Sequence, residues 1–261
     1  MNHNRIQQLL NSGKKDLLTI YFTAGFPDLK DTRSILAELE KSGADMVEIG
    51  IPYSDPVADG GTIQQSNQQA LENGMSIPKL FEQLEEVRKE ISIPIILMGY
   101  FNPIMQYGVE QFCIKCQEIG VDGLIIPDLP IEVYKKEYEE FFEVNGLINI
   151  FMITPQTSDQ RIHMIDRTQN GFIYMVSSAS ITGENRDIST TQKEYFERIK
   201  SMRLDHPLLI GFGISTHEHY KMASSYARGA IIGSAFIKSL QSGDNPILST
   251  QKFIESIKKE Q

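Results

Sequence analysis

Short apolar runs alternate with amphipathic stretches along the whole chain. Most of these runs are continuous and do not alternate with polar residues, which is typical of parallel strands covered on both faces. They predict strands at residues 17–23, 45–50, 94–99, 122–126, 147–153, 171–176, 207–212 and 227–233. The stretches between them repeat apolar residues at helical spacing, and they predict helices that include residues 30–42, 79–90, 132–144, 158–168 and 192–202.

Eight strand–helix units follow one another roughly every 30 residues, without a linker or a low-complexity segment. This order predicts an α/β protein: one (β/α)8 TIM-barrel domain over residues 1–261, with an extra N-terminal helix. An open doubly wound sheet is the alternative, but it usually places Gly-x-Gly-x-x-Gly after its first strand. The first strand here runs into Thr23-Ala24-Gly25-Phe26-Pro27, which favours the barrel.

Two extended loops interrupt the regular alternation. Residues 52–61 follow the second strand and are rich in Pro, Gly and Asp, whereas residues 177–191 follow the sixth and are rich in Ser, Thr, Gly and Asn. Both should lie at the carboxyl-terminal face, where barrel active sites are built from such loops. They are therefore candidates for lids over an active site.

Composition and charge narrow the possible partners. The chain has 25 Lys and Arg against 34 Asp and Glu, a net charge of −9, which disfavours nucleic acid. A small phosphorylated ligand remains compatible, because backbone N–H groups can hold one phosphate. No segment approaches the roughly 20 apolar residues of a membrane span, and the first residues resemble neither a secretory signal nor a transit peptide. We therefore expect a cytoplasmic protein that does not bind membranes.

The cysteines Cys113 and Cys116 form a Cys-x-x-Cys pair that could suggest redox or zinc chemistry. They fall on an apolar helical stripe with Val109, Phe112 and Ile119, and there is no second pair to complete a zinc site. We interpret both as buried helix residues.

Glu48 is an ionisable residue inside a strand that should be wholly apolar, near its carboxyl-terminal end. Burial would favour its neutral form and suit it to donate and accept protons near neutral pH. Asp59 follows in the adjacent loop, where Gly60 and Gly61 allow a tight turn back over the barrel mouth. Asp59 could alternatively cap the helix that begins near Thr62. We predict that Glu48 and Asp59 are a catalytic acid–base pair.

The residues that several other catalytic mechanisms require are missing from the sequence. No predicted strand contains the lysine that a Schiff-base aldolase requires, and the chain has no nucleophile elbow for Ser-His-Asp hydrolysis. The five histidines fall in tails, helices or strand starts and are not clustered as metal ligands: His3, His163, His206, His217 and His219. The mechanism that remains is proton transfer by carboxyl groups without a metal ion.

Glycine turns end the last two strands, at Gly211-Phe212-Gly213 and at Gly233-Ser234. Many barrels bind phosphate there, on backbone N–H groups and a helix N-terminus. Close helix–strand packing is the alternative explanation. Aromatic residues at predicted strand ends could stack on a flat apolar substrate: Tyr21, Tyr100, Tyr174 and Phe212.

The chain resembles the tryptophan synthase α-subunit family over essentially its whole length. The main motif is Glu-Ile-Gly-Ile-Pro-Tyr-Ser-Asp-Pro-Val-Ala-Asp-Gly at residues 48–60. Further matches are Thr23-Ala24-Gly25, Pro127-Asp128-Leu129-Pro130, Ile181-Thr182-Gly183 and Gly211-Phe212-Gly213-Ile214-Ser215. The resemblance implies a lyase of tryptophan biosynthesis, which splits indole-3-glycerol phosphate into indole and glyceraldehyde 3-phosphate by a retro-aldol step.

The resemblance also implies roles for individual residues. Glu48 would be the main acid–base group, and Asp59 would accept a hydrogen bond from the indole nitrogen. Thr182 would lie where a mobile loop closes on Asp59. The implied indole pocket comprises Tyr21, Met98, Tyr100, Ile125, Pro127, Met152, Tyr174 and Phe212. The implied phosphate site comprises Gly183, Gly213, Gly233 and Ser234.

A partner is implied as well: a β subunit that carries pyridoxal phosphate and receives indole through a tunnel in an α2β2 heterotetramer. The surface that meets it would include the loop around Pro56, together with Asn102 and Pro130. This chain itself is expected to hold no cofactor and no metal.

The sequence departs from the family pattern in two loops. The family usually has Gly-Pro after the catalytic Asp, where this chain has Gly60-Gly61, and residues 177–181 are unusual ahead of Thr182. Two other functions stay open on the residues alone: a phosphosugar isomerase, or a catalytically silent subunit that only activates a partner.

Overall fold

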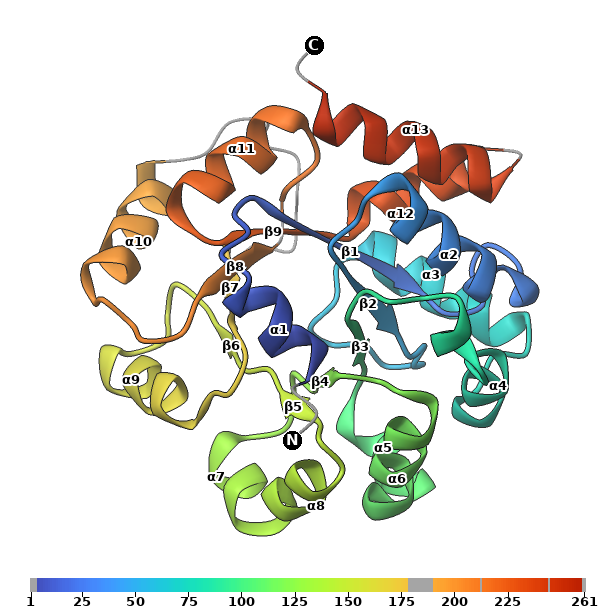
Figure 1. Ribbon diagram of the computed structural model, residues 1–261, viewed down its shortest axis with the longest axis horizontal. Coiled ribbons are helices and arrows are strands. Elements are labelled where there is room, and N and C mark those ends of the chain that lie inside the picture. The colour runs from blue at the N-terminus through green and yellow to red at the C-terminus, as the bar shows by residue number, and fades with distance from the viewer. Residues whose placement is uncertain (1–3, 178–189, 212, 244, 260–261) are drawn as a thin grey trace.

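The computed structural model describes residues 4–177, 190–211, 213–243 and 245–259. Parallel strands surround a central axis and helices cover them on the outside (Figure 1). The strands are β1 (Leu17–Thr23), β2 (Met46–Gly50), β3 (Ile95–Met98), β4 (Gly123–Ile125), β5 (Ile148–Asn149), β6 (Met152–Ile153), β7 (Ile173–Val176), β8 (Leu208–Gly211) and β9 (Gly229–Ile232). Each lies within a predicted strand, so the (β/α)8 barrel prediction is confirmed.

The predicted strand 147–153 is the one that differs, because it divides into β5 and β6. β5 pairs with β4 and β6 pairs with β7, so this segment closes the ring. Between them, the Ile150 N–H donates to the Leu124 carbonyl at 2.8 Å, and the Tyr174 N–H donates to the Phe151 carbonyl at 3.0 Å. The nine short strands therefore fill eight barrel positions, in the order β5-β4-β3-β2-β1-β9-β8-β7-β6.

The outer helices include every predicted helix, with two local differences. The helices are α2 (Thr32–Ser42), α3 (Gly61–Glu72), α4 (Ile77–Gln83), α5 (Phe101–Tyr107), α6 (Val109–Ile119), α7 (Ile131–Val133), α8 (Glu139–Val144), α9 (Asp159–Thr168), α10 (Thr190–Ser201), α11 (His217–Tyr226), α12 (Ser234–Gln241) and α13 (Pro246–Lys258). The predicted helix 79–90 stops at Gln83, because Glu86 adopts a left-handed φ of 55°. The predicted helix 132–144 contains a π-helical turn, Tyr134–Tyr138, between α7 and α8.

The predicted N-terminal helix is α1 (Arg5–Asn11), which lies across one end of the barrel (Figure 1). Its Ile6 is fully buried in the cluster of side chains that fills the barrel interior. Asp122, directly before β4, accepts hydrogen bonds from Arg5 at 3.1 Å and from Arg88 at 2.5 Å. The helix thus closes the amino-terminal end of the strands, which leaves the carboxyl-terminal end for a site.

Cys113 and Cys116 are fully buried on α6, as predicted. Burial raises the pKa of the Cys113 thiol to about 12, so this sulfur stays protonated and unreactive. Within the described residues, His, Cys, Asp and Glu side chains nowhere gather in a group of three or more that could hold a metal ion.

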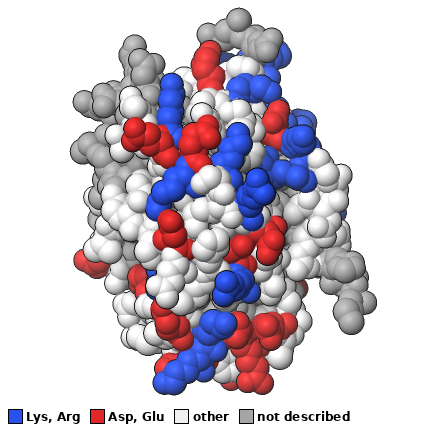
Figure 2. All heavy atoms as spheres, turned by 90° about the vertical axis from the view of Figure 1, so that its left-hand side faces the viewer, with Lys and Arg blue, Asp and Glu red and all other residues white. Residues whose placement is uncertain are grey.

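Charges of both signs are interspersed on the face that carries α9 and α10 (Figure 2). Two of its arginines are paired with acids, Arg161 with Glu132 at 2.8 Å and Arg198 with Asp159 at 2.9 Å. Among the described residues of this face, acidic side chains therefore interrupt the basic ones, which disfavours binding of a polyanion. In the described part of the chain, no helix is both long and apolar enough to cross a membrane.

Candidate active site

Glu48 is the central residue of β2, two residues before the carboxyl-terminal end of the strand, and its side chain lies in the barrel interior. It pairs in register with Tyr21 of β1 and Ile96 of β3, and it points the same way as Met46, which belongs to the interior cluster. Its side chain is fully buried, and neither carboxyl oxygen has a hydrogen-bond partner among the described residues. Desolvation raises the pKa of Glu48 to about 8. Glu48 therefore carries a proton at pH 7.

Asp59 lies in the loop between β2 and α3 and is 7 % exposed. Desolvation raises the pKa of its carboxyl to about 6, although hydrogen bonds from Tyr100 and Asn67 act in the opposite direction. The N-cap of α3 is Gly60, so Asp59 is not the helix cap that the sequence left as an alternative. The pKa order means that, at neutral pH, Glu48 is protonated while Asp59 is ionised.

A small cavity brings Asp59 together with four predicted pocket residues. Its volume is about 10 Å³, room for about one water molecule. Its walls are Tyr21, Ile51, Asp59, Asn67, Met98, Gly99, Tyr100 and Pro127. The Tyr100 hydroxyl also accepts a hydrogen bond from the Ala58 N–H at 2.9 Å, which ties the Asp59 loop to the end of β3. A substrate the size of two fused rings must displace side chains here.

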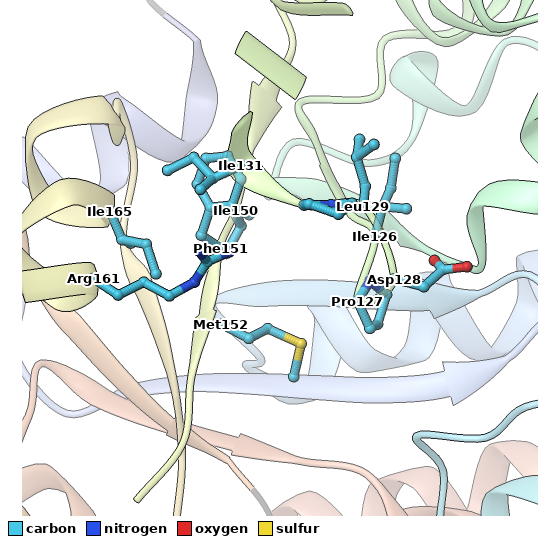
Figure 3. Close-up of a pocket in the computed structure, with 11 residues that line it drawn as sticks. Ile126, Pro127, Asp128, Leu129, Ile131, Ile150, Phe151, Met152, Arg161 and Ile165 are labelled. Carbon is cyan, nitrogen blue, oxygen red and sulfur yellow. The ribbon is translucent and has the colours of Figure 1, made fainter. Parts of the chain in front are cut away.

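A larger pocket of about 230 Å³ adjoins this cavity and shares Pro127 with it. In Figure 3, Met152 reaches from β6 towards Pro127, and Arg161 extends from α9 along the opposite wall. The pocket contains neither carboxyl group, so its greater size does not make it the reaction centre. It does supply an apolar wall next to the cavity, from the predicted residues Pro127 and Met152.

The remaining predicted pocket residues are distributed as follows. Ile125 and Tyr174 are buried in the barrel interior. Burial, and then the charges of Glu48 and Asp59, raise the pKa of the Tyr174 hydroxyl, so Tyr174 is neutral and lies within electrostatic reach of both carboxyls. Phe212 and Thr182 fall outside the described residues.

The predicted phosphate residues lie where β8 and β9 end. Gly213 has a φ of 77°, a left-handed conformation that favours glycine, and Gly233 is the N-cap of α12, whose first residue is Ser234. Backbone N–H groups at this helix start have no carbonyl partner within the helix and can face an anion. Gly183 falls outside the described residues.

Of the predicted partner-contact residues, Asn102 and Pro130 are exposed and Pro56 is buried. Next to Pro56, Val57 is 79 % exposed, an unusual position for an apolar side chain. Asn102 donates to the Tyr53 hydroxyl at 3.4 Å, and the Tyr53 ring packs against Tyr100 with centroids 5.3 Å apart. These contacts connect the exposed loop to the cavity.

Asn67 is the site residue that sequence reasoning missed. It lies on α3 and is 2 % exposed. The sequence did contain a hint of its burial. The inward-facing residues of α3 are Ile63, Ser66, Asn67 and Ala70, and two of these core positions are polar.

Gly50 ends β2 directly beneath the ring of Tyr21. A Cβ at Gly50 would lie 2.1 Å from the Tyr21 hydroxyl oxygen. We expect Gly50→Ala to lower the free energy of unfolding by about 1–3 kcal/mol, the usual cost of overpacking, measured by urea unfolding. A Gly61→Ala control, where a Cβ meets nothing within 4 Å, should leave stability nearly unchanged. Adding Tyr21→Leu to Gly50→Ala should recover part of the loss; an equal loss without Tyr21 would assign the strain elsewhere.

Several known proteins that are similar to this chain are described as tryptophan synthase alpha chains. Residues 6–261 match the family model described as tryptophan synthase alpha chain. The tryptophan synthase alpha chain of Flavobacterium psychrophilum is 58 % identical over 254 residues, covering 97 % of this chain and 99 % of that protein. That of Flavobacterium johnsoniae is 57 % identical over 256 residues, covering 98 % and 100 %.

Solved structures of tryptophan synthase alpha subunits are also similar to this chain. Tryptophan synthase subunit alpha of Legionella pneumophila superposes with a TM-score of 0.87 at 33 % identity, covering 97 % of both chains. A chain of Mycobacterium tuberculosis tryptophan synthase, in a structure described as the aminoacrylate-bound form, gives a TM-score of 0.84 at 26 % identity, covering 97 % of this chain and 98 % of that one.

Proposed function

The chain belongs to the tryptophan synthase alpha chain family, and from this premise we propose that Glu48 and Asp59 are the acid–base pair of its reaction. The activity is that of a lyase in tryptophan biosynthesis, which cleaves indole-3-glycerol phosphate to indole and glyceraldehyde 3-phosphate. The observation that carries the proposal is a fully buried carboxyl, Glu48, inside a barrel strand and without a hydrogen-bond partner among the described residues.

Glu48 first acts as the acid. Its pKa of about 8 keeps it protonated at pH 7, so it can give its proton to C3 of the indole ring. The resulting carboxylate then takes the proton of the glycerol hydroxyl next to the ring. As that hydroxyl becomes an aldehyde, the carbon–carbon bond breaks and its electron pair returns to the ring. Glu48 ends protonated, ready for another turnover.

Asp59 stabilises the charge that appears between these two steps. Protonation at C3 places positive charge on the ring nitrogen, whose N–H then becomes a strong donor. An ionised Asp59, with a pKa of about 6, accepts that hydrogen bond in a cavity that holds little water. The two carboxyls need opposite protonation states at neutral pH, and their different surroundings supply them.

The remaining roles follow from position. We assign indole contact to Tyr21, Met98, Tyr100, Pro127 and Met152, which line the cavity and the adjoining pocket, and to Ile125 and Tyr174 beneath them. Phosphate binding is assigned to Gly213, Gly233 and Ser234. Thr182, Gly183 and Phe212 keep their predicted roles. Glu48 can perform both proton transfers while Asp59 stabilises the charge between them, so we propose that this chain needs no cofactor or metal of its own.

The partner we propose is a pyridoxal phosphate-dependent β subunit in an α2β2 complex. Support comes from a set of exposed side chains around the carboxyl-terminal end of neighbouring strands. Val57 follows β2, Asn102 and Met105 lie on α5 after β3, and Pro130 follows β4. Val57 and Met105 are apolar and are 79 % and 49 % exposed, as suits a surface that becomes covered on association.

Indole formation from indole-3-glycerol phosphate, measured with and without a cognate β subunit, tests the proposal. We expect indole from the chain alone, a higher rate with the partner, and much stronger inhibition by indole propanol phosphate than by a simple triose phosphate, which resembles only one product. Inhibition by the triose phosphate alone would support an isomerase instead. Failure to form indole even with the β subunit would contradict the proposed chemistry.

A further inference from the structure

The inward face of α3 is polar where it meets the barrel mouth. Ser66 and Asn67 are adjacent, and both are buried, at 0 % and 2 % exposure. Buried polar side chains destabilise a fold unless hydrogen bonds compensate them. Each of the two side chains therefore needs hydrogen-bond partners that compensate its burial.

Ser66 is explained by structure alone. Its hydroxyl lies 2.7 Å from the Thr23 hydroxyl of β1 and donates to the Ile63 carbonyl at 2.8 Å. The contact with Thr23 attaches α3 to β1, and the bond to Ile63 lies within the helix. Ser66 is absent from the cavity wall.

Asn67 is not explained in this way. Its side chain lines the cavity beside Tyr21, Asp59 and Tyr100. Its amide forms a hydrogen bond with the Asp59 carboxyl, and its Oδ1 has no partner among the described residues. A side chain that leaves one buried polar atom unpaired costs stability. Asn67 therefore serves its contact with Asp59 better than it serves packing.

We propose that Asn67 is a positioning residue that, together with Tyr100, holds the Asp59 carboxyl in its ionised, substrate-facing state. The inference rests on the proposed role of Asp59. Asn67 on α3 and Tyr100, the N-cap of α5, line the same cavity as Asp59, and both are hydrogen-bond donors to its carboxyl. The Tyr100 hydroxyl accepts from the Ala58 N–H, so its own hydrogen is free for Asp59.

The groups around Asp59 determine what the loss of Asn67 would do. Tyr21 on β1, Tyr100 at the start of α5 and Tyr174 on β7 are neutral hydroxyls with raised pKa values. Glu48 on β2 is protonated at neutral pH. Within the described part of the chain, hydrogen bonds from Tyr100 and Asn67 are the interactions that oppose the desolvation of the Asp59 carboxyl. Without Asn67, Asp59 should take up a proton at a higher pH.

The test is the pH profile of turnover of the full chain in complex with its β subunit. We expect Asn67→Leu to move the acid limb of the kcat profile upward, so that the ratio of kcat at pH 6 to kcat at pH 8 falls by roughly threefold or more. Asn67→Asp keeps the shape of the side chain and adds a like charge, and it should move the limb in the same direction. The matched control is Ser66→Ala, which should lower stability without moving the limb.

An unmoved acid limb in folded Asn67→Leu or Asn67→Asp would overturn the inference, as would an equal movement in Ser66→Ala. The Asp59→Asn variant separates this failure from failure of the proposed function. If Asp59→Asn loses activity while the Asn67 variants keep the acid limb of the unmodified chain, only the role of Asn67 is wrong. If Asp59→Asn retains full activity, the role of Asp59 is wrong, and with it the inference.

Discussion

Glu48→Gln should release indole at least about a hundredfold more slowly than the unmodified chain, because it removes the group that both gives and takes the proton. Glutamine has nearly the same shape, so the barrel should fold as before. The measurement is kcat for indole formation in the presence of the β subunit. A folded Glu48→Gln protein that keeps most of its activity would remove Glu48 from the mechanism.

The same substitution should make the protein more stable at neutral and alkaline pH. Because the pKa of Glu48 is raised to about 8 in the folded state, the folded chain holds this proton between about pH 4.5 and pH 8 while the unfolded chain has lost it. Stability therefore falls as pH rises through this window. At pH 8 the deficit is on the order of a few kcal/mol. Glutamine does not titrate, so thermal unfolding of Glu48→Gln should lose this part of the pH dependence.

Glu38→Gln is the matched control. Burial would raise the pKa of Glu38, but hydrogen bonds from Gln251 and Ser42 and the nearby Lys41 lower it overall. Glu38 therefore stabilises the fold above its unfolded pKa, and that contribution is lost as pH falls through its folded pKa. Its replacement should slightly destabilise the protein at pH 7 and leave kcat unchanged. A stability gain in both variants would indicate a general effect of net charge.

The barrel could be predicted from sequence because its strands are buried on both faces. Such strands read as continuous apolar runs, and β1 at Leu17–Thr23 coincides with its predicted range. The boundaries of the helices were less accurate. Leu84, Val87 and Ile91 are all buried, so their spacing indicated burial and could not reveal the left-handed Glu86 that ends the helix.

Glu48 could be located from sequence because a carboxyl inside an apolar strand is an exception that one residue is enough to reveal. Asp59 depended on the loop motif, and its contacts come from elements distant in sequence, Tyr100 and Asn67. Asn67 was missed because an Asn on a helix is ordinarily solvent-exposed. Only the packing of α3 against the barrel mouth shows that this one faces the cavity.

Asp59→Asn should reduce kcat for indole formation by about a hundredfold, a loss typical of removing one charge-stabilising group from a buried site. Asparagine can still accept a hydrogen bond from the ring nitrogen, but it lacks the negative charge that opposes the positive intermediate. The unmodified chain should lose activity as pH falls through about 6, where Asp59 takes up a proton. Asp59→Asn should lack this limb while its residual activity still declines above about pH 8, where Glu48 ionises.

The two carboxyl variants together separate the roles of the pair. Because the pKa of Asp59 is raised in the folded state, stability falls as pH rises from about 4 to about 6, and Asp59→Asn should be the more stable protein above that window. Glu48→Gln should show its gain over a wider window that extends to about pH 8. If Asp59→Asn turned over at the unmodified rate, Asp59 would be a loop residue held by Tyr100 and Asn67, and Glu48 would work without a charge-stabilising partner.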